Sequence, residues 1–124
     1  LLGDAVDADI LHARVRDPSA EVRAKAARAL GRLGADEAAS ELRRALADRI
    51  PYVRATAAIA LGQVGDRAAA DALLEQARVD GFEPARAAAE ALVRIDPDRV
   101  RVAASLANAG PHLTEAADLL AIRA

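Results

Sequence analysis

The apolar positions of this chain follow a helical period, and the pattern repeats. The segment Glu21 to Gly34, EVRAKAARALGRLG, returns further along the chain as Tyr52 to Gly65, YVRATAAIALGQVG. The apolar residues of the first copy fall on one helix face and are expected to form a buried stripe: Val22, Ala26, Ala29, Leu30 and Leu33. A single helix cannot bury such a stripe alone, so the copies are expected to stack on one another.

A second apolar pattern follows each copy and predicts a partner helix. Leu11, Leu42 and Leu73 are separated by the same spacing as the two copies, so the chain is expected to open on the second helix of a repeat. The pattern predicts helices over about 1–16, 19–32, 36–47, 51–64, 66–79, 84–95, 98–108 and 112–123.

Proline, glycine and capping residues separate the predicted helices. Pro18 disfavours helix at Asp17, and the side chain of Asp17 or Ser19 can cap the next helix. Gly34 can adopt the left-handed conformation that ends a helix. The expected organisation is a single domain, with a half repeat over 1–16, repeats over about 17–48, 49–80 and 81–110, and a terminal helix over 111–124.

The third repeat departs from the pattern, and the last helix departs further. Val93 and Asp96 stand where the second repeat has Gly62 and Gly65. The Ala-Ala and Leu positions of the last helix follow those of the third repeat too early, so the register has slipped. We expect this helix to be a cap or another half repeat.

Composition supports an all-α fold and gives little sign of a charged partner. Alanine supplies 35 of the 124 residues, which favours closely packed helices over a sheet. The net charge of −2 gives no reason to expect a polyanion such as DNA. There is no Cys, no apolar run of membrane-spanning length and no signal-peptide pattern at the start, so a cytoplasmic location is the default expectation. The missing initial Met suggests either a start inside a longer chain or a removed N-terminus.

The repeated motif resembles that of a known family. The pattern V-R-x-x-A-A-x-x-L-G-x-x-G begins at Val22 and Val53, and A-x-x-x-L-x-x-x-L-x-D follows from Ala38. It resembles the short HEAT-like repeats named after phycobilisome lyases. The resemblance implies a right-handed, armadillo-like α-solenoid of stacked antiparallel helix pairs, with first helices on the convex side and second helices lining a concave groove. Such proteins usually bind other proteins, and the family also includes bilin lyase subunits and a di-iron hydroxylase.

The resemblance also implies structural roles for the most regular polar residues. It places Asp17, Arg23, Asp48 and Arg54 in a ladder of hydrogen bonds between neighbouring repeats. Gly31 and Gly62 are expected at positions of close helix packing, because G-R-L-G lacks the spacing and the preceding strand of a nucleotide motif.

The chain shows no catalytic or metal-binding motif. His12 and His112 are the only histidines, and they are expected at opposite ends of an extended molecule, too far apart to share a metal ion. The three serines, at positions 19, 40 and 105, are not in a G-x-S-x-G motif. A base-binding groove would need more aromatic residues than Tyr52 and Phe82. We therefore expect no cofactor, no metal and no nucleic acid partner.

The remaining candidate surface is the exposed side of the second helices. Its expected groove residues are Asp9, His12, Arg16, Ser40, Arg43, Arg44, Asp71, Glu75 and Arg78. Arginine is favoured at protein interfaces, so the leading prediction is a non-enzymatic scaffold that binds a partner protein, or a second copy of itself, through this groove. Two alternatives stay open: an accessory or catalytic subunit of a bilin lyase, and a regulatory repeat domain of a larger protein.

Overall fold

The computed structural model describes residues 10–34 and 36–123, and their fold is a stack of helices. The elements are α2 (Ala20–Leu33), α3 (Asp36–Ala45), α4 (Pro51–Val64), the short 3-10 helix η1 (Arg67–Ala69), α5 (Ala70–Val79), α6 (Phe82–Ile95), α7 (Pro97–Ala104) and α8 (Pro111–Arg123). Residues 10–14 are also helical, whereas the rest of the predicted first helix lies outside the described residues. The described part of the chain contains no strand, which confirms the all-α prediction.

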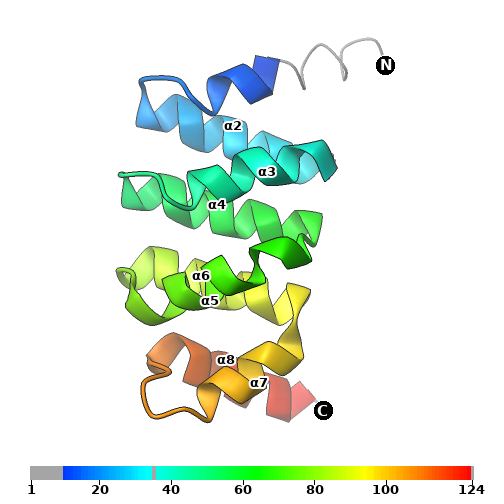
Figure 1. Ribbon diagram of the computed structural model, residues 1–124, viewed down its shortest axis with the longest axis vertical. Helices are drawn as coiled ribbons and strands as arrows, with labels where there is room; N and C mark the ends of the chain where they lie inside the picture. Colours follow the sequence, from blue (N-terminus) through cyan, green and yellow to red (C-terminus); the bar gives the residue numbers. More distant parts are fainter. Residues whose placement is uncertain (1–9, 35, 124) are drawn as a thin grey trace.

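The helices form two layers that follow the sequence along the long axis of the molecule (Figure 1). We call α2, α4, α6 and α8 the first-helix layer, in which each helix contacts the next. Residues 10–14, α3, α5 and α7 form the second-helix layer in front of it. Successive helix pairs therefore stack as an α-solenoid, so residues at equivalent positions of the motif lie on neighbouring repeats.

The ends of the first helices follow the capping chemistry in the sequence. Ser19 precedes α2, and its side chain accepts a hydrogen bond from the N–H of Val22 at 3.4 Å. Gly34 and Gly65 end α2 and α4 with φ angles of 68° and 78°, a left-handed conformation that residues with a Cβ rarely adopt. The predicted glycine stop at Gly34 is confirmed.

Some helix boundaries differ from the prediction. The second helices are shorter than their apolar patterns, because α3 ends at Ala45 and α7 at Ala104. Helix α6 begins at Phe82, before Pro84. Pro84 fits there because the first N–H groups of a helix have no partner within the helix.

The buried face of α2 includes Ala26 and Leu30 of the predicted stripe but not its other three residues. Leu33 is 44% exposed, and Val22 and Ala29 are only half-buried. The buried residues of α2 are Arg23, Ala24, Ala26, Ala27, Leu30 and Gly31. Helix α2 packs against both α3 and α4, and this widens its buried face towards its small residues.

Glycine allows α2 and α4 to approach closely, as expected for Gly31 and Gly62. A Cβ at residue 31 would lie 2.7 Å from the Cβ and 2.8 Å from the Cα of Ala60. A Cβ at residue 62 would lie 3.1 Å from the same two atoms of Ala91, on α6. The first-helix layer is therefore packed with glycine against alanine at two successive junctions.

Candidate interaction surface

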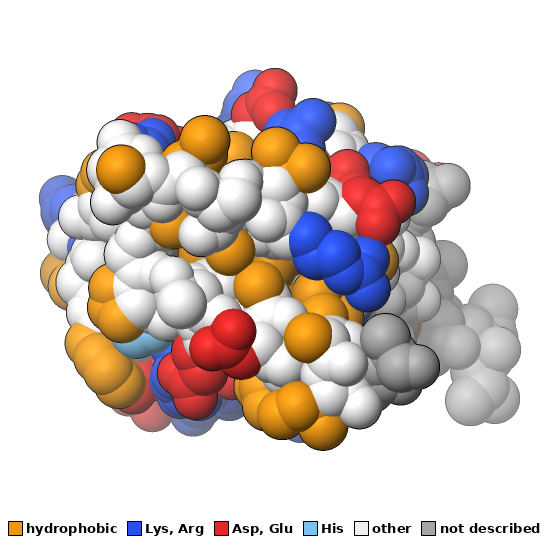
Figure 2. Space-filling view, turned by 90° about the horizontal axis from the view of Figure 1, so that it is seen from below, with side chains coloured by type: hydrophobic (Ala, Val, Ile, Leu, Met, Phe, Trp, Pro, Cys, Tyr) orange, Lys and Arg blue, Asp and Glu red, His pale blue; other side chains and the backbone are white. Residues whose placement is uncertain are grey.

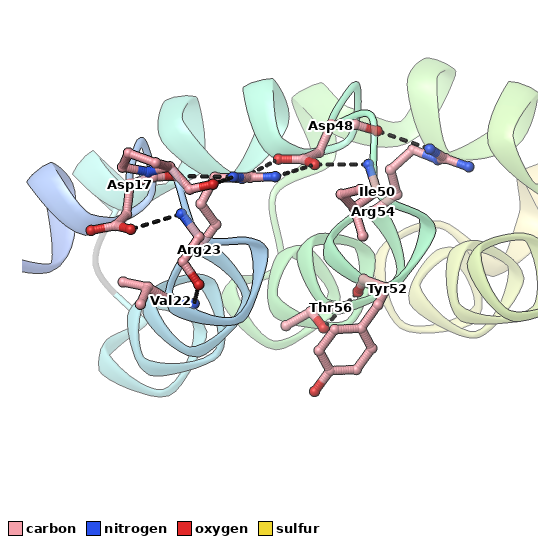
Figure 3. A network of polar contacts seen from close by, with 10 residues as sticks. Asp17, Val22, Arg23, Asp48, Ile50, Tyr52, Arg54 and Thr56 are labelled. Carbon is pink, nitrogen blue, oxygen red and sulfur yellow. Dashed lines mark hydrogen bonds and ion pairs between the residues drawn. The ribbon is translucent and has the colours of Figure 1, made fainter.

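A ladder of arginine and aspartate residues joins the repeats along one edge of the stack (Figure 3). Arg23 donates from Nε and Nη2 to the two carboxylate oxygens of Asp48, at 2.8 and 3.1 Å. One repeat later, Arg54 makes the same two contacts with Asp80, both at 2.8 Å. These bidentate pairs fix the orientation of each repeat on the next.

The same arginines also bind the loops that precede their helices. Arg23 Nη1 donates to the main-chain carbonyls of Asp17 and Pro18, at 2.9 and 3.0 Å. Arg54 Nη1 donates to the carbonyl of Asp48 at 2.9 Å. Asp17 therefore joins the ladder through its backbone, while its side chain accepts a hydrogen bond from the N–H of Ser19. Asp80 was missing from the prediction because it lies one position beyond the place that the repeat spacing assigns to an equivalent of Asp48.

The ladder lowers the pKa of its carboxylates. Burial alone would raise the pKa of Asp48, but the hydrogen bonds from Arg23 and from the N–H of Ile50 outweigh it and lower the pKa below the ordinary 3.8. Arg54 is the main cause of the lowered pKa of Asp80, whose burial acts in the opposite direction.

These shifts predict how stability depends on pH. A carboxylate with a lowered pKa in the folded state stabilises the fold above its unfolded pKa, and this contribution is lost as the pH falls through the folded pKa. We expect the free energy of unfolding to decrease below about pH 4. Urea denaturation between pH 2 and 7 would measure this, and an Asp48→Asn variant should lose less stability on acidification. An equally steep loss in Asp48→Asn would contradict the assignment.

Ion pairs also occupy most charges of the predicted groove. Arg16, just after the first described helix, pairs with Glu41 of α3 at 3.0 Å, and Arg43 pairs with Asp66 at 2.7 Å. Arg99 of α7 donates to Asp71. These contacts cross from one repeat to the next and form a second set of links, which sequence spacing did not indicate. Within α5, Arg78 pairs with Glu75 at 2.8 Å. The charges of this face are therefore largely matched inside the molecule.

Arg44 and Ser40 differ from their neighbours on this face. Both are exposed on α3, and no carboxylate in the described part of the chain lies within ion-pair distance of Arg44. His12 is half-buried, and Asp9 lies outside the described residues. Arg44 is thus the one predicted groove residue that combines exposure with a charge not matched by another described residue.

The second-helix layer becomes apolar towards its C-terminal end. Val102 and Leu106, on and just after α7, are 67% and 57% exposed. Leu119 and Ile122 of α8 are also exposed at this end of the stack. Figure 2 looks at this end and shows hydrophobic side chains gathered there, with groups of acidic and basic side chains between them. Such a patch is typical of a surface that another element covers.

The two histidines lie in different surroundings at the two ends of the stack. His112 packs edge-to-face on Phe82, with ring centroids 5.0 Å apart, and so joins the first turns of α8 and α6. Among residues 10–34 and 36–123, no group of three His, Asp or Glu side chains gathers as a metal site would require. None of the described helices combines the length and apolar character needed to cross a membrane.

The comparisons with known proteins identify the repeats. A family model described as HEAT repeats matches residues 8–94, well over half of the chain. The chain belongs to the HEAT-repeat family. This match covers the ladder and both glycine contacts of the first-helix layer, so these features belong to the HEAT-repeat part of the chain. The phycobilisome-lyase subtype stays a prediction. A search of curated proteins found no match.

Proposed function

We propose that this HEAT-repeat protein is a non-enzymatic interaction module that binds a partner protein through its second-helix layer. HEAT repeats commonly mediate protein–protein interaction. The observation that carries the choice of surface is Arg44, an exposed cation with no matching carboxylate among the described residues, whereas the other predicted groove arginines are paired: Arg16, Arg43 and Arg78.

The chemistry of this face suggests the chemistry of the partner. A carboxylate of the partner can form a bidentate pair with the guanidinium of Arg44. Further along the stack, Val102 and Leu106 offer exposed apolar area that a partner can bury. The partner is therefore expected to carry an acidic group and an apolar group, spaced to match α3 and α7.

A non-catalytic role agrees with the use of the buried polar groups. Arg23 is tied to Asp48, Thr56 donates to the carbonyl of Tyr52 at 2.9 Å within α4, and Gln76 donates to Asp80 at 3.3 Å. Each of these groups links or stiffens the scaffold. None belongs to a nucleophile–base pair of the kind that covalent catalysis needs.

The proposal can be tested by cross-linking and mutation at α3. A photo-reactive amino acid in place of Ser40 would cross-link the partner protein and so identify it. Calorimetry would then measure the affinity of the purified partner for variants of this protein. Arg44→Glu is expected to weaken binding about tenfold or more and to lower the melting temperature only slightly, because no intramolecular pair is broken and only the interaction of a cation with the last turn of α3 is lost. The control is Arg32→Glu, the same change at an exposed arginine of α2. Equal binding by Arg44→Glu and the wild type would disprove the surface assignment.

Arg43 is expected to behave differently from its neighbour Arg44. Its carboxylate partner, Asp66, has a side chain only 13% exposed, so Arg43→Glu would place two carboxylates together. We expect a clearly lower melting temperature for Arg43→Glu than for Arg44→Glu, measured by circular dichroism, because both changes act on the last turn of α3 but only the first breaks an ion pair. Equal melting temperatures for both variants would show that the Arg43–Asp66 pair does not stabilise the fold.

A further inference from the structure

The first-helix layer carries two hollows, one on each side of α6. The hollow between α4 and α6 has a volume of about 220 Å³. Its floor is formed by Gly62, Ala87 and Ala91, and the exposed Ile59 lies at its edge. The small side chains at this glycine-packed junction leave room above them for an apolar side chain from outside.

The second hollow results from the change in the repeat pattern. Val93 stands where glycine permits close packing in the two preceding first helices, so α8 cannot approach α6 as closely as α6 approaches α4. An open cleft of about 360 Å³ separates the two helices. Ala89, Val93 and Leu120 line it, with the half-exposed Leu119 beside them.

Two charged residues of α6, Glu90 and Arg94, line both hollows. Glu90 is already matched, because Arg86 donates to its carboxylate at 3.1 Å. Arg94 is exposed and has no carboxylate within ion-pair distance among the described residues. The Arg94 side chain passes over Gly62, since its Cδ lies 3.8 Å from the position that a Cβ of residue 62 would occupy. The ridge between the hollows therefore presents one unmatched positive charge.

We propose that this surface binds an amphipathic helix of a partner protein, with one apolar side chain in each hollow and a carboxylate on Arg94. Packed helices lie about 8–10 Å apart, so hollows on the two sides of α6 are separated by about that distance. Two residues seven positions apart on a helix are separated by about 10 Å and lie on the same face. The residue three or four positions after the first then lies over the ridge, at Arg94.

The other charges around the larger cleft agree with this placement. Glu115 belongs to the start of α8, where Phe82 and His112 hold the first turns of α6 and α8 together. Arg94 belongs to the last turn of α6, about two helical turns away. A partner carboxylate at Arg94 is therefore far from Glu115, and Arg86 shields it from Glu90.

This inference rests on the proposed function, protein binding, but assigns it a second surface. A library of displayed helical peptides would be selected on the wild-type protein, and the affinity of selected peptides would be measured by fluorescence anisotropy. We expect enriched sequences with two large apolar residues seven positions apart and Asp or Glu three or four positions after the first. Arg94→Glu is expected to weaken their binding about tenfold or more, and Arg94→Gln by less.

Controls separate this surface from the others. Arg32 occupies the same repeat position on α2 but lines neither hollow, so Arg32→Glu should change affinity less than about twofold. Leu119→Glu should weaken binding, and circular dichroism would show that each variant is folded.

Failure to enrich such sequences, or equal binding by Arg94→Glu and the wild type, would overturn the inference. Selected peptides that depend on Arg44 instead would retain the proposed function and reject this surface. Self-association of the wild type that Arg94→Glu abolishes, measured by light scattering, would show that a second copy fills the hollows and would also overturn the inference.

Discussion

Replacing Gly31 with alanine is expected to destabilise the protein by about 2 kcal/mol, the balance of an overpacking cost and a gain in helix propensity. The new Cβ would lie 2.7 Å from the Cβ and 2.8 Å from the Cα of Ala60, and a main-chain atom cannot move aside without shifting α4. Overpacking of this kind costs about 1–3 kcal/mol, and a backbone contact belongs at the upper end of that range. Alanine regains about 1 kcal/mol through its higher helix propensity. The net loss corresponds to a decrease of about 6–10 °C in melting temperature.

Two other glycines provide the comparison for this prediction. At Gly62 the nearest atoms of Ala91 would be 3.1 Å away, so alanine there should cost clearly less than at Gly31. At Gly81, the N-cap of α6, no atom lies within 4 Å of the new Cβ, and alanine should cost less than about 1 kcal/mol, because only the N-cap preference for glycine is lost. Urea denaturation followed by circular dichroism would rank the three variants. Gly31→Ala as stable as Gly81→Ala would contradict the close contact between α2 and α4.

Replacing Asp48 with alanine is expected to cost about 2–3 kcal/mol. The change leaves the guanidinium of Arg23 without its carboxylate in a position where its side chain is 10% exposed, and the N–H of Ile50 also loses its acceptor. Two successive repeats then lose their best-defined polar contact. The loss is smaller than for a pair in the protein interior, because water reaches the edge of the ladder.

An exposed ion pair supplies the control for Asp48→Ala. Asp98 pairs with Arg101 at the same distance of 2.8 Å, but its side chain is 89% exposed. Asp98→Ala should therefore change the free energy of unfolding by no more than about 0.5 kcal/mol. Both variants would be measured by urea denaturation at pH 7. Similar losses for the two would mean that the ladder contributes no more than a surface ion pair.

The sequence predicted the features that recur with the helical period and with the repeat itself. Helix α4 has the predicted bounds of 51–64, because Pro51 and Gly65 mark its two ends. The sequence places Gly31 and Gly62 at close helix contacts, because small residues at a fixed repeat position serve the same junction in each repeat. In this part of the chain the local helix propensity and the packing of the repeats favour the same structure. A single sequence is therefore sufficient to predict the helix bounds and the close contacts there.

Apart from the ladder, which the family resemblance implied, the sequence did not predict side-chain contacts between different repeats. The pair of Arg43 with Asp66 joins residues 23 positions apart, outside the repeat period, so spacing gave no sign of it. That pair removes Arg43 from the expected groove cations and leaves Arg44. The sequence indicated the cleft beside Val93 only through the loss of the repeat glycine. The volume of the cleft depends on the distance between α6 and α8, which the sequence does not give.

The central claim is that different residues carry stability and binding in this HEAT-repeat protein. The most direct test measures how tightly the Asp48→Ala and Arg44→Glu variants bind the partner protein that was identified by cross-linking. The measurement is made at a temperature where both variants are folded. We expect Asp48→Ala to bind as the wild type does and Arg44→Glu to bind about tenfold or more weakly. Loss of affinity in Asp48→Ala together with wild-type affinity in Arg44→Glu would contradict the claim.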